Sequence, residues 1–128
     1  DVWIWGDVWG IQEVLYNLID NAVKFSRQRS LIKVRLSQGL DIGQLEIEDA
    51  GERIPVGERE KIFEQFYRGE GAAYNGVPGS GLGLFIVKHI IAQHGGRMIV
   101  EEGELGGNRF KVTLPSKGRN CNAECTGS

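Results

Sequence analysis

The sequence lacks several features that would assign it quickly to a class of protein. Its 128 residues include two cysteines, Cys121 and Cys125, whose spacing and polar surroundings favour neither a disulfide nor a zinc site. No apolar run approaches the roughly 20 residues that span a bilayer. No signal-peptide pattern opens the chain, and a formal net charge of −2 gives no overall attraction to nucleic acid. These absences favour a cytoplasmic domain that contacts neither membrane nor nucleic acid.

Glycine, by contrast, is abundant and unevenly placed. There are 19 glycines, and six of them fall within residues 69–83. Such a local excess requires a local explanation, because glycine serves tight turns and close approaches of backbone to a ligand. The chain is long enough to bury one hydrophobic core. It opens directly in a strand-like run at Asp1, which predicts that it is part of a larger protein.

Hydrophobic periodicity predicts an α+β fold with two layers. Period-two alternation marks strands, and apolar residues three or four apart mark helices. The antiparallel hairpins predict a mixed, mostly antiparallel sheet with the helices packed on one face, a two-layer α/β sandwich. We expect a domain over residues 1–115 and a polar, disordered tail over 116–128. The predicted strands are 2–5, 31–36, 45–48, 97–102 and 108–114, and the predicted helices are 7–25, 57–66 and 84–94.

The first predicted helix carries a polar stripe beside its apolar face. Asn17, Asn21 and Lys24 stand at i, i+4 and i+7, and therefore share one side of the helix. Asparagine is a poor residue for a helix interior, so two of them one turn apart suggest a purpose. Amide oxygens can hold hydrated Mg²⁺, and a lysine can reach a phosphate. A solvated polar face explains the same residues equally well from the sequence alone.

Two further segments have the chemistry of a ligand site. Asp49-Ala50-Gly51 follows a predicted strand, so its carboxylate could accept a hydrogen bond from an exocyclic amine, although an ordinary Asp-Gly turn is the simpler interpretation. Gly79-Ser80-Gly81-Leu82-Gly83-Leu84 runs directly into a helix, where successive backbone N–H groups can bind an anion. This second segment is neither the dinucleotide fingerprint nor a P-loop.

Four segments together resemble the nucleotide-binding motifs of sensor histidine kinases, in the family's order and spacing. Residues 13–25 look like the N box, 49–55 the G1 box, 62–68 the F box and 79–84 the G2 box. The resemblance covers residues 6 to about 115. It implies the Bergerat-type ATP-binding fold shared with gyrase, the Hsp90 chaperones and MutL mismatch-repair proteins.

The resemblance also implies ATP and Mg²⁺ as ligands, with roles for individual residues. Asn21 would coordinate Mg²⁺, and Asn17 would assist near the phosphates. Asp49 would bind the adenine amino group. Asn17, Lys24 and Arg68 would lie at the reacting phosphate as catalytic residues. The other residues implied are Phe25 beside ribose and adenine, Gly51 and Ile54 in the base pocket, and Gly79, Gly81, Leu82, Gly83 and Leu84 around the phosphates under a lid formed by residues 69–78.

Asn17 indicates transfer of phosphate to another nucleophile in preference to hydrolysis. Hydrolytic members of the superfamily resemble one another in having Glu at this position, and a neutral amide cannot act as a base for water at pH 7. The sequence departs from the G1 pattern at Arg53, where a second glycine is expected. Arg53 could follow another backbone path and point outward, or it could crowd the adenine edge and weaken ATP binding.

The chain lacks the acceptor histidine that a histidine kinase requires. Its two histidines, His89 and His94, lie in and at the end of the helix after the G2-like segment, and we interpret both as structural. The resemblance therefore implies an upstream helical dimerisation and phosphoacceptor domain, a response regulator and a homodimeric full-length protein as partners. The alternatives are an anti-sigma-type serine kinase, a degenerate regulatory module supported only by Arg53, and a gyrase-like or Hsp90-like ATPase disfavoured by Asn17.

Overall fold

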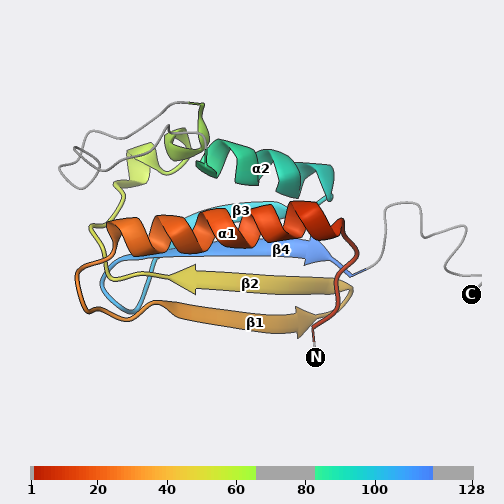
Figure 1. Cartoon of the computed structure of the whole chain (residues 1–128), viewed down its shortest axis with the longest axis horizontal. Coiled ribbons are helices and arrows are strands. Elements are labelled where there is room, and N and C mark those ends of the chain that lie inside the picture. The colour runs from red at the N-terminus through yellow and green to blue at the C-terminus, as the bar shows by residue number, and fades with distance from the viewer. Residues whose placement is uncertain (1, 66–82, 117–128) are drawn as a thin grey trace, which may run out of the picture.

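Two helices cover one face of a four-stranded sheet in the computed structural model, which describes residues 2–65 and 83–116. The strands of the described residues lie in the order β1-β2-β4-β3, and all three pairings are antiparallel, where a mixed, mostly antiparallel sheet was predicted. Figure 1 shows both helices on the same side of the sheet. The α+β class and the two-layer arrangement are confirmed. The elements are α1 (Val8–Phe25), β1 (Lys33–Gly39), β2 (Ile42–Glu48), α2 (Gly83–Gln93), β3 (Arg97–Glu102) and β4 (Asn108–Pro115).

Helix α1 forms where the sequence predicts it. Asp7 is the N-cap, since its Oδ2 accepts a hydrogen bond of 2.9 Å from the backbone N–H of Gly10. The buried residues Val14, Leu18 and Ala22 recur every four positions, so one face of the helix packs against the sheet. The polar stripe lies on the flank of this face, where Asn17 and Asn21 are partly buried and Lys24 is exposed.

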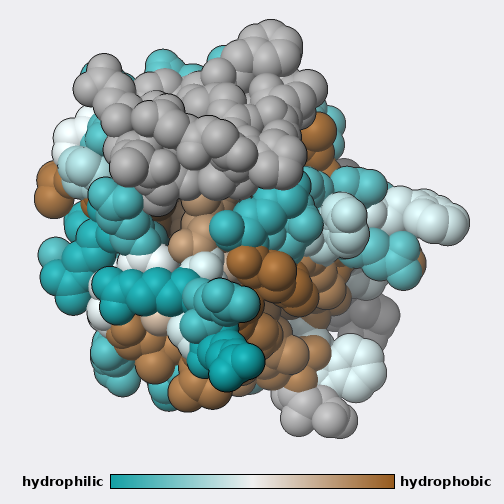
Figure 2. Space-filling view, turned by 60° about the vertical axis from the view of Figure 1, so that its left-hand side comes forward, coloured by the Kyte–Doolittle hydropathy of each residue, from teal (hydrophilic) through white to brown (hydrophobic). Residues whose placement is uncertain are grey.

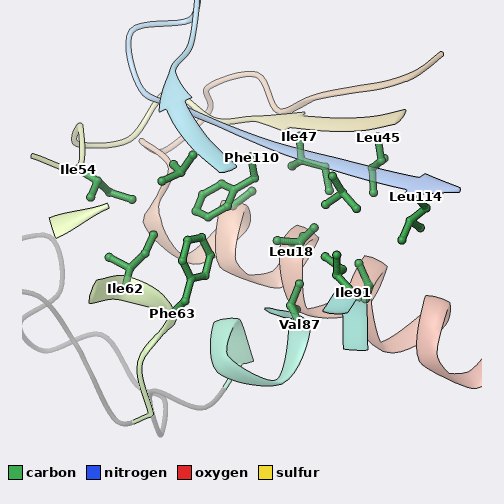
Figure 3. Packing of buried hydrophobic residues seen from close by; sticks show 14 residues of the cluster. Leu18, Leu45, Ile47, Ile54, Ile62, Phe63, Val87, Ile91, Phe110 and Leu114 are labelled. Carbon is green, nitrogen blue, oxygen red and sulfur yellow. The ribbon is translucent and has the colours of Figure 1, made fainter. Parts of the chain in front are cut away.

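The core lies between the helices and the inner face of the sheet (Figure 3). Leu45 on β2 pairs with Val112 on β4, and Ile47 pairs with Phe110, so inward side chains of neighbouring strands meet. Phe110 also contacts the ring of Phe63 edge to face, with centroids 6.4 Å apart. The core thereby extends from the sheet to the connection that follows β2.

That connection is not the helix predicted over residues 57–66. Two short 3₁₀ helices take its place, η1 (Val56–Glu58) and η2 (Lys61–Phe63), and neither has a side-chain cap. Gly57 disfavours a longer helix, and the tighter 3₁₀ turn supports only short runs. Ile62 and Phe63 are buried, so packing of these two side chains holds the segment.

The strand predicted at residues 2–5 is also wrong. The backbone N–H of Trp5 donates to the carbonyl of Pro115 over 3.1 Å, but proline has no N–H with which to return the bond. A ladder therefore cannot continue at the end of β4. The segment is held instead by packing across β2, where a Cβ on Gly43 would lie 2.5 Å from Ile4.

The end of α2 is tied to the start of α1. His94 Nε2 accepts a hydrogen bond of 2.9 Å from the backbone N–H of Asp7, and Nδ1 lies 2.8 Å from the carbonyl oxygen of Ile90. Both ring nitrogens thus have partners, and the ring links the two helices. Among the described residues, no helix is long and apolar enough to cross a membrane.

Candidate nucleotide site

Asp49 lies directly after β2 and is almost completely buried, with a relative exposure of 2%. Its Oδ1 accepts hydrogen bonds from the backbone N–H groups of Gly51, at 2.8 Å, and Asn108, at 3.4 Å. Burial raises the pKa of Asp49, and these two bonds only partly oppose that rise. Because an ionised carboxylate has about four acceptor positions, capacity remains for a donor on a ligand.

The segment after Asp49 packs against the end of α1. A Cβ on Gly51 would lie 2.1 Å from the carbonyl oxygen of Phe25, so only glycine fits this approach. The backbone N–H of Ala50 donates to Ser26 Oγ over 3.3 Å. Two segments that the sequence predicted to share a site, the end of α1 and the loop after β2, are therefore in contact.

On α1, the amide of Asn17 is held in one orientation. Its Nδ2 donates to the carbonyl oxygen of Glu13 at 2.8 Å and to Glu13 Oε2 at 3.1 Å. The amide oxygen faces the first residue of α2, because a Cβ on Gly83 would lie 3.1 Å from Asn17 Oδ1. An oxygen donor is thus directed toward the helix start that follows the glycine-rich segment, which fits an oxygen-preferring cation such as Mg²⁺.

The other predicted site residues are in several different environments. Asn21 lies on α1 one turn beyond Asn17 and is partly exposed. Lys24 Nζ is 2.9 Å from Asp20 Oδ2, so its charge is already paired on the same helix. Ile54 is buried, and the side chain of Leu84 packs against the core. Arg68, Gly79, Gly81, Leu82 and the predicted lid lie outside the described residues.

Arg53 follows the first of its two predicted paths. Only Arg29 and Asp41 have positive φ among the described residues other than glycine, so Arg53 does not take the left-handed conformation of a glycine. Its guanidinium is half exposed and lies 3.4 Å from a carboxylate oxygen of Glu102 on β3. The side chain is therefore directed to β3 by an ion pair.

The sequence analysis missed Asn108, the first residue of β4. It is buried, and its side-chain amide contacts the loop after Asp49 at two points, Ile54 and Glu52. A signal for this residue was present, since Asn108, Phe110, Val112 and Leu114 alternate along one strand and all are buried. An amide on the inward face of a strand needs internal partners.

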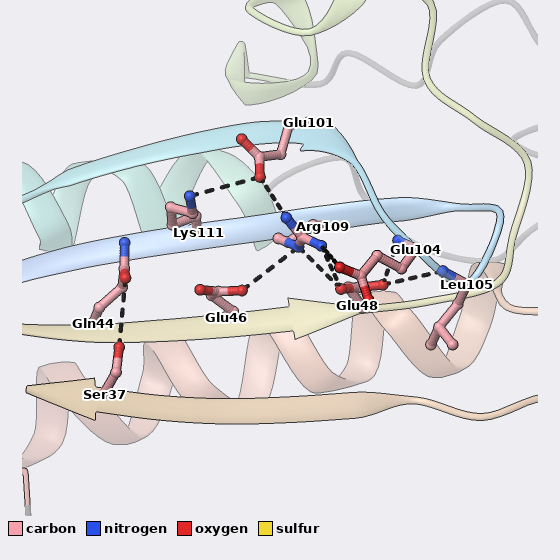
Figure 4. Close-up of polar contacts among 9 residues, drawn as sticks. All are labelled: Ser37, Gln44, Glu46, Glu48, Glu101, Glu104, Leu105, Arg109 and Lys111. Atoms are coloured by element: carbon pink, nitrogen blue, oxygen red, sulfur yellow. Dashed lines mark hydrogen bonds and ion pairs between the residues drawn. The ribbon is translucent and has the colours of Figure 1, made fainter.

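The turn between β3 and β4 is held against the same end of the sheet. Glu48 Oε2 accepts hydrogen bonds from the backbone N–H groups of Glu104, at 2.9 Å, and Leu105, at 3.2 Å. Arg109 Nη2 lies 2.9 Å from Glu48 Oε1 (Figure 4). A Cβ on Gly107 would lie 2.4 Å from the carbonyl oxygen of Asp49. In the view turned toward the end where these loops gather, hydrophilic and hydrophobic residues both cover parts of the described surface (Figure 2).

Comparison with known proteins identifies the class that this arrangement defines. The sequence matches the family described as histidine kinase-, DNA gyrase B-, and HSP90-like ATPase over residues 6–118. The chain belongs to this family, as an ATP-binding catalytic domain of the sensor histidine kinase type.

Relatives and solved structures agree on the subgroup. The signal transduction histidine-protein kinase/phosphatase MprB of Mycobacterium tuberculosis (strain ATCC 25618 / H37Rv) is 44% identical over 120 residues, covering 89% of this chain and 23% of that protein. The chain thus spans about a quarter of the length of such curated relatives. A structure of a mycobacterial sensor histidine kinase MprB has a TM-score of 0.76 at 36% identity, covering 86% of this chain and 72% of that one. The nucleotide-free catalytic domain of histidine kinase ThkA has a TM-score of 0.75 at 30% identity, covering 87% and 70%.

Proposed function

We propose that this domain binds Mg-ATP and presents its γ-phosphate for transfer to a histidine on a separate dimerisation domain. The observation that carries the proposal is the buried Asp49, whose carboxylate is held beside the end of α1 by Gly51 and Asn108. A buried acceptor suits the exocyclic amine of adenine. The triphosphate would then extend along the polar stripe of α1 toward the start of α2.

The polar stripe has the donors for the metal and the phosphates. Asn17 and Asn21 would hold Mg²⁺ through their amide oxygens, and the bound ion would neutralise charge on the phosphate oxygens. Lys24 would have to leave Asp20 to reach a phosphate, which is inexpensive for an exposed ion pair. Arg68, Gly79, Gly81, Leu82 and Gly83 would complete the phosphate site.

Transfer to histidine is favoured over hydrolysis by the residue at position 17. The fixed amide of Asn17 cannot remove a proton from water, and we assign no other residue as a general base for water. An upstream helical domain would supply the acceptor histidine, and a response regulator would receive the phosphoryl group from it. We infer a cytoplasmic location for the domain and a homodimer for the full-length protein. The outward path of Arg53 removes the single argument for a degenerate regulatory module.

The proposal is tested by calorimetric titration with a non-hydrolysable ATP analogue, with and without Mg²⁺. We expect saturable binding that strengthens with Mg²⁺ and weakens at least about 100-fold in Asp49→Asn, because a donor replaces the acceptor opposite the adenine amine. Asp41→Asn is the matched control. It lies in the turn between β1 and β2, at the other end of β2, and its positive φ of 58° is tolerated by Asn. Absence of binding at millimolar nucleotide, or equal affinity of Asp49→Asn and the original protein, would refute the proposal.

A further inference from the structure

Asn108 joins the two segments that form the base end of the proposed nucleotide site. Its backbone is paired with Asp49, since Asp49 N–H donates to the Asn108 carbonyl at 3.0 Å and Asn108 N–H donates to Asp49 Oδ1 at 3.4 Å. Its side chain is paired with the following loop, because Oδ1 accepts from Ile54 N–H at 2.9 Å and Nδ2 donates to the Glu52 carbonyl at 2.9 Å. One residue thus contacts both Asp49 and the loop that follows it.

The side-chain bonds replace the strand pairing that the loop lacks. Residues 51–55 form neither helix nor strand, so their backbone groups have no ladder partners. A side-chain amide has an oxygen that accepts and an NH₂ group that donates. Here the oxygen accepts from the N–H of Ile54, and the NH₂ group donates to the carbonyl of Glu52, two residues earlier in the same loop. Asn108 is 5% exposed and Ile54 is 4% exposed, so water does not readily compete for the bond between them, whereas the bond to the exposed Glu52 is only partly buried.

We propose that Asn108 is a positioning residue for base recognition, which fixes loop 51–54 beside Asp49 so that the pocket selects a 6-aminopurine over a 6-oxopurine. This inference rests on the proposed function. A 6-amino group donates to the Asp49 carboxylate, whereas a 6-oxo group would place an acceptor against it. Discrimination requires that the base cannot shift sideways, and the loop carrying Gly51 and Ile54 is the wall that prevents the shift.

A looser loop changes selectivity more than affinity for the phosphates. In Asn108→Ala the wall is no longer tied to β4, and a base can move until an unfavourable 6-oxo contact is relieved. The bonds of the Asn108 side chain go to Ile54 and Glu52 and not to the polar stripe of α1, so we expect binding of the triphosphate to be preserved. If Asn108 had only a structural role, its replacement would lower the melting temperature and weaken the binding of both purine nucleotides by the same factor.

The experiment measures dissociation constants for non-hydrolysable ATP and ITP analogues in the presence of Mg²⁺, with the melting temperature of each variant. We expect the original domain to prefer the adenine nucleotide. We expect Asn108→Ala to reduce that preference by about tenfold or more, mainly because the 6-oxo analogue can then shift out of its unfavourable contact with Asp49 and bind more tightly. Gln44→Ala is the control, because it removes an amide on the outer face of β2 whose Oε1 is 3.5 Å from Ser37 Oγ. Its preference should be unchanged.

A second variant keeps the test decisive if Asn108→Ala does not fold. Asn108→Asp preserves the side-chain volume and the acceptor for Ile54 N–H but removes the donor to Glu52, and it should also reduce the preference. An original domain that prefers adenine, with variants that keep the same preference, would overturn the role of Asn108 alone. An original domain with no preference would overturn both this inference and the assignment of Asp49 to adenine.

Discussion

At the scale of single residues, the burial of Asp49 suits its proposed role in binding but lowers the stability of the folded domain. The carboxylate is buried where a ligand amine is expected, and burial raises its pKa above the ordinary value of 3.8. An acid with a raised pKa binds its proton more tightly in the folded state. Its favourable contribution to the stability of the folded domain is therefore complete below the unfolded-state pKa, and it is lost as the pH rises through the folded-state pKa. At neutral pH the nucleotide-free domain holds this charge at a cost.

Asp49→Asn should therefore stabilise the nucleotide-free domain while it abolishes adenine binding. The Asn side-chain oxygen can still accept the bonds from Gly51 and Asn108, and the buried charge is gone. We expect the melting temperature at pH 7 to rise by roughly 2–5 °C. The gain should shrink as the pH falls toward 3.8, because the original domain is then protonated. Thermal unfolding measured by circular dichroism across this range tests the prediction, and a variant less stable than the original at pH 7 would contradict it.

The sequence places some of the proposed site residues in the fold and misses those defined by tertiary contact. Spacing puts Asn17 in a stripe on a helix and Asp49 and Gly51 directly after a strand, whereas their roles toward ATP come from the resemblance to histidine kinases and stay predictions. Asn108 is recognised only when its position on the inward face of β4 is combined with the loop that it meets. Arg53 could not be decided from the sequence, because the carboxylate beside its guanidinium belongs to Glu102 on β3, a contact made far along the chain.

At the scale of elements, the hairpin of β3 and β4 is held by a carboxylate on a neighbouring strand. Burial pushes the pKa of Glu48 upward, but the bonds from Arg109, Leu105 and Glu104 outweigh it and leave the pKa below its ordinary value of 4.5. An acid with a lowered pKa contributes stability that is present above the unfolded-state pKa and is lost as the pH falls through the folded-state pKa. The pH dependence is thus opposite in sign to that of Asp49.

Glu48→Gln should destabilise the domain at neutral pH and have little effect in acid. The amide can keep one acceptor for the turn but loses the charge-assisted bonds, so we expect a loss of about 1–2 kcal/mol at pH 7. Urea unfolding at neutral pH and below 4.5 measures the difference. Glu46→Gln is the control on the same face of β2, since Glu46 makes only a 3.5 Å ion pair with Arg109, and it should cost less than about 1 kcal/mol. An equal loss in acid and at neutral pH would contradict the role of the charge.

Helices and strands with clear hydrophobic periodicity were predicted well. Segments whose structure depends on one particular partner residue were not. Helix α1 and the β3–β4 hairpin match their predicted ranges closely. Strand β1 begins at Lys33 and reaches Gly39, because its tight turn at Leu40 and Asp41 lets pairing with β2 continue further than alternation suggested. The segment before α1 has strand-like alternation, yet it forms no strand, because Pro115 has no N–H with which to pair. Alternation describes which side chains are buried, but a strand also needs a partner with free backbone groups.

At the scale of the whole molecule, the proposed function requires a phosphoacceptor that we do not assign within this chain. The chain contains two histidines. Both ring nitrogens of His94 are engaged, with Asp7 and Ile90, so this ring is a structural link between the two helices. His89 is exposed on α2 and lies outside the residues that we assign to the nucleotide. Asn17, held by Glu13, cannot activate water. The proposed function therefore makes turnover depend on a second domain.

Incubation of this domain alone with Mg-ATP labelled at the γ-phosphate should give neither labelled protein nor phosphate release above the rate in buffer. Addition of a helical domain that carries a histidine-kinase acceptor histidine should produce label on that added domain, which is lost in acid and stable in alkali as expected for phosphohistidine. Asp49→Asn should abolish this transfer, and Asp41→Asn should preserve it. Label on the domain itself that disappears in His89→Ala would identify an internal acceptor. Steady phosphate release that Asp49→Asn abolishes would instead show that water is the acceptor, and that an amide at position 17 does not exclude hydrolysis.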